Sequence, residues 1–135
     1  MATITDIRQG LADTITAYGL TAFARVPVSP ISNAPAVVVR PSRGNPNAMG
    51  PGHASLSFEL VCVASRADNL HGQDVLDAML SLTGDRSVYA AVKSDRTLGV
   101  GVDASCGDWF DWGVSTFGDV DFFSAVVDCT VHTGA

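Results

Sequence analysis

One stretch near the middle of the chain, SLSFELVCVAS at residues 55–65, has the clearest structural pattern in the sequence. Successive side chains of a β-strand point to opposite faces, so alternating apolar residues predict a strand with one buried face. The predicted apolar face consists of Leu56, Phe58, Leu60, Cys62 and Ala64. We expect the other face to be the polar, outer side of a long strand, with Ser57, Glu59, Val61, Val63 and Ser65.

A helix and two short strands are predicted before this strand. Thr5 and Asp6 suit the first turn of a helix, and Gly19 suits the residue just past its end. TAFARV at residues 21–26 and AVVVR at residues 36–40 are proline-bounded and rich in strand-forming side chains. The apolar stripe of the helix recurs at helical spacing, at Ile7, Leu11, Ile15 and Tyr18.

A second helix is predicted after residues 55–65, capped by Asp68 or Asn69 and ended by Gly84. A shorter helical turn around Val88, Ala91 and Val92 follows Asp85 and Ser87. The second helix would bury a wide apolar arc, which consists of Leu70, Val75, Leu76, Met79, Leu80 and Leu82.

The last third of the chain is predicted to be extended. RTLGVGVDAS at residues 96–105 is an irregular strand weakened by glycines, and residues 110–116 and 120–131 are strands joined by a turn at Gly118 and Asp119. One face of the last strand would be Phe123, Ala125, Val127, Cys129 and Val131.

This order of elements predicts a single α+β domain over residues 1–135. Strands in runs, with hairpin-length connections, favour a mainly antiparallel sheet with two main helices packed on one face. The prolines and glycines of PSRGNPNAMGPGH at residues 41–53 argue against a helix or a hydrogen-bonded ladder there. We therefore expect a flexible, functional loop at about residues 41–54.

Composition narrows the classes of function. The net charge is −6 and the pI is about 4.6, which argues against a surface built to bind nucleic acid or anionic lipid. Only 16% of the residues are charged and 47% are apolar, a balance typical of chains that hide surface in an oligomer. We expect neither a signal peptide nor a membrane span, and three unpaired cysteines suit a reducing compartment.

No residue pattern indicates a catalytic, cofactor or metal site. GVGVDA at residues 99–104 matches part of a dinucleotide fingerprint, but no helix start follows it. Cys62 and Cys129 are predicted to be core residues, whereas the role of Cys106, in a glycine-flanked loop, stays open. Zinc-like spacing is absent among His53, His71 and His132.

Acidic residues gather near the C-terminus, with no Lys or Arg after Arg96. A solvated or partner-facing surface is the favoured interpretation, ahead of a metal site and of catalysis. Trp109 and Trp112 could anchor either the core or an interface. The acidic residues are Asp103, Asp108, Asp111, Asp119, Asp121 and Asp128.

In the order of its segments the chain resembles the tail terminator (tail completion) proteins of long-tailed bacteriophages, especially those infecting actinobacteria. The resemblance covers nearly the whole chain. It rests on the ITDIRQGLADTI helix, the AVVVRPS strand, the proline- and glycine-rich loop, the SLSFELVCVAS strand leading to LDAML, and DRTLGVGV.

The resemblance implies a structural protein without enzymatic activity or cofactor. Its copies would form a ring, probably a hexamer, that caps the tail tube, ends tube polymerisation and docks to the head-tail connector (stopper) protein. It would lie at the head-proximal end of the tail in the virion, after assembly in the host cytoplasm, with DNA only as the passing genome. A head-tail connector or tail tube subunit is the alternative, and a small intracellular ligand-binding domain or enzyme is less favoured.

Interface residues are predicted in the loop, on the central strand and in the acidic region. They are Arg43, Asn45, Asn47, Met49, His53, Glu59, Asp108, Trp109, Asp111, Trp112, Asp119 and Asp121.

Overall fold

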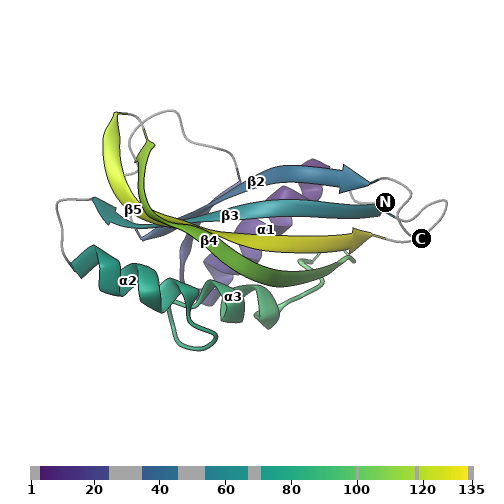
Figure 1. Ribbon diagram of the computed structural model, residues 1–135. Coiled ribbons are helices and arrows are strands. Elements are labelled where there is room, and N and C mark those ends of the chain that lie inside the picture. Colours follow the sequence, from purple (N-terminus) through teal and green to yellow (C-terminus); the bar gives the residue numbers. More distant parts are fainter. Residues whose placement is uncertain are drawn as a thin grey trace.

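The computed structural model describes residues 4–24, 35–45, 54–66, 71–99, 101–117 and 119–133. Along these residues three helices and five strands follow one another (Figure 1): α1 (Ile4–Tyr18), β1 (Thr21–Phe23), β2 (Ala36–Asn45), β3 (Ala54–Arg66), α2 (His71–Leu80), α3 (Val88–Ser94), β4 (Asp103–Phe117) and β5 (Val120–Thr133). None of these helices is both long and apolar enough to span a bilayer.

The described strands form one sheet in the order β1-β2-β3-β5-β4. β1 runs parallel to β2, and the other neighbouring pairs are antiparallel. The predicted α+β class with a mainly antiparallel sheet is thus confirmed. The expectation of two main helices is not, because α3 is a third helix with Val88 and Ala91 fully buried. Ser87 caps α3 by accepting a hydrogen bond from the Ala90 amide.

The main core lies between one face of the sheet and all three helices. α1 packs on β1 and β2, α2 on β3 and β5, and α3 on β4. The predicted stripe of α1 is confirmed, since Ile7, Leu11 and Ile15 have no exposed surface. The predicted core faces of β3 and β5 also belong to this cluster, with Phe58, Leu60, Cys62, Ala64, Phe123, Ala125, Val127, Cys129 and Val131.

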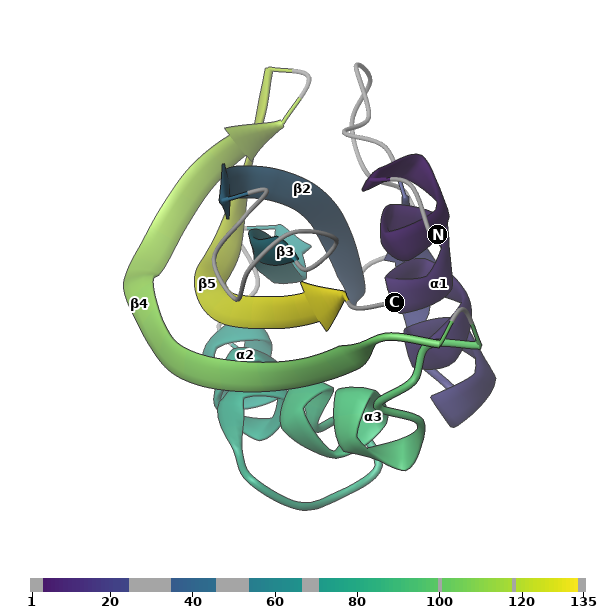
Figure 2. The same ribbon diagram turned by 90° about the vertical axis from the view of Figure 1, so that its right-hand side faces the viewer.

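The opposite face of the sheet is partly buried as well, because the sheet curls. Figure 2 shows β4 sweeping along a curved path outside β5. The prediction of a polar outer face on β3 is therefore wrong for Val61 and Val63, although Ser57 and Glu59 stay partly exposed. The second cluster consists of Ala36, Val38, Val61, Val63, Phe122 and Val126.

Residues 41–45 belong to β2, so the prediction that residues 41–53 form no ladder is wrong for this part. Pro41 is the register partner of Phe58, and Gly44 is the partner of Leu56. A proline is tolerated because β1 pairs only with Ala36–Val38, the first residues of β2. The other edge of Pro41 therefore has no described partner strand. Residues 46–53, where the expected loop continues, lie outside the described residues.

Two further boundaries differ from the predictions. The first half of the predicted strand at residues 96–105 is a turn, in which Leu98, Gly99 and Gly101 have positive φ, and β4 follows it directly. A strand, and not a helix, begins at Asp103. α2 ends at Leu80, so Leu82 is not part of its apolar arc and is 77% exposed.

The remaining differences concern element ends. The first strand covers Thr21–Phe23 rather than residues 21–26. α1 already begins at Ile4, one residue before the proposed cap. The expected cap residues of α2, Asp68 and Asn69, lie outside the described residues, as do Leu70 and Gly118.

Candidate interaction surface

An exposed strip follows β4, which lies at the edge of the sheet and pairs only with β5 among the described residues. Three of its large apolar side chains are exposed, Trp109 by 50%, Trp112 by 39% and Val114 by 56%. We call this strip the β4 surface, and it consists of Asp108, Trp109, Asp111, Trp112, Val114, Asp119 and Asp121.

Two shifts in the pairing of β4 with β5 turn the large apolar side chains of the β4 surface toward solvent. The register with β5 shifts between Cys106 and Trp109 and again between Phe110 and Gly113. Asp111, inside the second shift, has φ of 55°. Bulges of this kind bend a strand and redirect its side chains. Phe110 consequently packs on the second core cluster, while both tryptophans lie on the surface.

Neither tryptophan belongs to the core, so a core role is excluded and a role in an interface stays a prediction. The indole nitrogen of Trp112 donates a hydrogen bond of 3.1 Å to Oδ1 of Asp77 on α2. Leu80, Ser81 and Trp109 complete a shallow depression between α2 and β4. The contact with Asp77 orients the Trp112 ring and still leaves part of it open to a partner.

The β4 surface is acidic, and no described cation neutralises it. Ion pairs are formed away from it, by Arg40 with Glu59 at 2.8 Å and by Arg96 with Asp103 at 3.0 Å. On the β4 surface, Asp121 accepts a hydrogen bond of 2.6 Å from the Thr116 hydroxyl. Its other carboxylates have water or a partner to interact with, and burying them requires positive charge on that partner.

The central part of the sheet carries a second polar region that the sequence analysis did not identify. Arg40, Glu59 and Asp128 are neighbours in the register of β2, β3 and β5 and form a row of charges across the strands. Glu59, a predicted interface residue, is engaged by Arg40 in this row. The signal that could have revealed the pair is the antiparallel register between the AVVVR and SLSFEL stretches.

The structure therefore divides the predicted interface residues. Asp108, Trp109, Asp111 and Trp112 are exposed along β4, whereas Asp119 and Asp121 are exposed at the turn into β5. Arg43 is exposed on β2, and Glu59 lies on β3. Asn45 ends β2, with a side chain outside the described part of the chain, and the residues that lie wholly outside it are Asn47, Met49 and His53.

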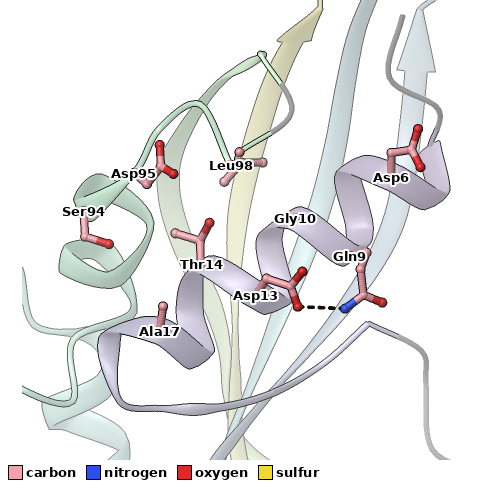
Figure 3. Close-up of a pocket in the computed structure, with 10 residues that line it drawn as sticks. Asp6, Gln9, Gly10, Asp13, Thr14, Ala17, Ser94, Asp95 and Leu98 are labelled. Carbon is pink, nitrogen blue, oxygen red and sulfur yellow. Dashed lines mark hydrogen bonds between the residues drawn. The ribbon is translucent and has the colours of Figure 1, made fainter.

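An open cleft of about 460 Å³ lies between α1 and the turn after α3 (Figure 3). Asp6, Asp13 and Asp95 stand apart along it, and Asp13 accepts a hydrogen bond of 2.9 Å from Gln9. Within the described residues, no three His, Cys, Asp or Glu side chains are grouped so that they could hold a metal ion. The cleft is an open groove in which the carboxylates do not converge on one point.

The cysteines are free thiols with different surroundings. Cys62 and Cys129 are buried in the main core as predicted, and burial raises the pKa of the Cys62 thiol. A hydrogen bond with the Cys106 side chain, and then burial, raise the pKa of Cys129. Cys106 is half-buried within β4, so its expected place in a loop is wrong.

Histidines do not cluster with these cysteines in the described residues. His71 is exposed at the start of α2, and His132 is half-buried on β5 with its Nδ1 atom lacking a hydrogen-bond partner. The third, His53, lies outside the described part.

No protein-family model matches the chain, and no curated protein has a significantly similar sequence. The resemblance to tail terminator proteins thus stays a prediction based on the order of segments in this sequence.

Proposed function

We propose that this chain is a structural subunit of a phage tail, which forms a ring at the head-proximal end of the tail tube. The observation that carries the proposal is the β4 surface, where exposed tryptophans lie along an edge strand and acidic residues without a described ion pair lie along it and at its turn. The resemblance to tail terminator proteins supports it independently. The ring would end tube polymerisation and join the tail to the connector.

The aromatic part of the β4 surface suits a contact between subunits. Tryptophan is enriched among residues that dominate binding free energy, because it buries a large apolar area and still donates a hydrogen bond. Trp109 and Trp112 are about half and two-fifths exposed, so a neighbour that covers them gains apolar burial. A contact between this surface and a different face of the next copy closes into a ring when the rotation fits. A stable contact requires about 800 Å² on each subunit.

The acidic part of the surface suits either a basic docking partner or the passage of DNA. Asp119 and Asp121 lie at the turn between β4 and β5, both exposed. Carboxylates without neighbouring cations repel phosphates, so a channel wall of this kind lets the genome pass without binding it. The same carboxylates would attract a basic patch on the connector.

Deletion of this gene from the encoding phage tests the proposal. We expect particles with separate heads and with tails of uncontrolled length, because nothing ends the tube or links it to the connector. Electron microscopy of the lysate measures tail length and head attachment, and a plasmid copy of the gene should restore both. Absence of tail tubes would instead identify a tube subunit, and headless tails of uniform length would identify a connector. Normal particles would exclude all three functions.

A further inference from the structure

Two cysteines face each other across neighbouring strands. Cys106 on β4 and Cys129 on β5 are register partners in an antiparallel pair. Directly opposed residues in such a pair have Cα atoms about 4.5–5.5 Å apart, within the range of about 4.4–6.8 Å found in disulfides. The Cys106 side chain also raises the pKa of Cys129, as expected for two neighbouring thiols. The register therefore places the two residues within reach of a disulfide bond.

Of the two thiols, only Cys106 is partly accessible to solvent. Cys106 is half-buried and borders open depressions lined by Leu82 and Tyr89. Cys129 has no exposed surface, and the third thiol, Cys62, is buried in the core. A small reagent in solution consequently reaches Cys106 first. Cys129 reacts only with a group that Cys106 brings to it.

We propose that Cys106 and Cys129 form a dithiol site that a small disulfide of the glutathione type oxidises to an intrasubunit disulfide. The Cys106 thiolate attacks one sulfur of the reagent, which forms a mixed disulfide and releases one small thiol. Cys129 then loses its proton and attacks the Cys106 sulfur, which releases the second small thiol. The protein gives up two electrons and two protons, and the reagent takes them up as two thiols.

The attack of Cys129 on the mixed disulfide is expected to be slower than the attack of Cys106 on the reagent. Burial keeps Cys129 in its thiol form, whereas the attacking species is the thiolate. A mixed disulfide at Cys106 is therefore expected to precede closure. If the proposed virion role is correct, the site would be reduced in the host cytoplasm and would close after release, fastening the edge strand β4 to β5.

Oxidation of the purified full chain with excess oxidised glutathione tests the site without reference to the phage. Intact mass should first show one added glutathione, and then a protein lighter than the reduced form by two hydrogens. Peptide mapping should place the link between Cys106 and Cys129. The melting temperature should rise by roughly 10 °C, because the link closes the β4–β5 hairpin in the unfolded chain.

Three variants complete the test. Cys129→Ala should stop at the mixed disulfide on Cys106, Cys106→Ala should resist oxidation while folded, and Cys62→Ala should behave as the wild type. If Cys129→Ala does not fold, the half-buried position of Cys106 keeps the second variant usable. A wild-type chain that never progresses beyond the mixed disulfide would overturn the proposal. A link to Cys62, or equally rapid oxidation of Cys106→Ala, would also overturn it.

Discussion

Replacing both Asp119 and Asp121 by lysine is expected to abolish the formation of infectious particles while the subunit still folds. Both carboxylates are exposed, and the double replacement changes the charge of the β4 surface by about four units. A basic partner would then be repelled, or passing DNA would bind. The fold should lose about 1–2 kcal/mol, because Asp119 has φ of 66° and Asp121 accepts a hydrogen bond from Thr116.

Complementation of a phage that lacks the gene measures this effect as infectious particles per cell. Asp13→Lys with Asp85→Lys is the matched control, because it changes the same charge at exposed sites on α1 and in the turn before α3. Asp119→Asn with Asp121→Asn removes the charge and keeps, at position 119, a residue that tolerates positive φ. Normal yields from the folded lysine variant, or an equal loss in the control, would show that the acidic turn is ordinary solvated surface.

Replacing Gly10 by valine is expected to reduce the free energy of unfolding by about 3 kcal/mol. A Cβ atom on Gly10 would lie 2.7 Å from the Leu98 carbonyl oxygen and 3.1 Å from the Leu98 Cβ. The turn cannot easily retreat, since hydrogen bonds from Leu98 to Asp95 and from Ala104 to Arg96 fix it. α1 would have to move away from the turn and loosen the main core.

The Gly10→Ala variant distinguishes the effect of this contact on the free energy of unfolding from the effect of helix propensity. Propensity alone would make alanine stabilising by about 1 kcal/mol, whereas the close contact makes it destabilising by a similar amount. Ala17→Val is the control for β-branching, because Ala17 is exposed on the same helix, and it should cost less than about 0.7 kcal/mol. Urea unfolding of the three variants gives the free energies. A stabilised Gly10→Ala protein would contradict the close packing of α1 on this turn.

Local patterns were sufficient to predict the elements of the main core. The spacing of Ile7, Leu11 and Ile15 marks one face of α1, and the alternation around Phe58 marks one face of β3. Both patterns reflect burial on a single side, which follows directly from helix and strand geometry. The second core cluster could not be predicted in this way. Val61 and Val63 are buried there because the sheet curls, and curling depends on how distant strands pair.

The candidate surface was predicted in part. The acidic character around Asp119 follows from composition, but the exposure of Trp109 and Trp112 depends on register shifts between β4 and β5. A bulge is a property of two paired strands, so a single stretch of sequence does not specify it. The continuation of β2 through residues 41–45 also depends on the pairing of two strands, because pairing with β3 prevails over the local effect of Pro41.

Native mass spectrometry of the purified chain, mixed with the tail tube protein of the same phage, shows whether copies of this chain close into a ring. The expected result is one assembly with a fixed number of copies, six if the resemblance to tail terminator proteins holds, and no series of larger multiples. Monomers in every mixture, or an open-ended series of oligomers, would contradict it.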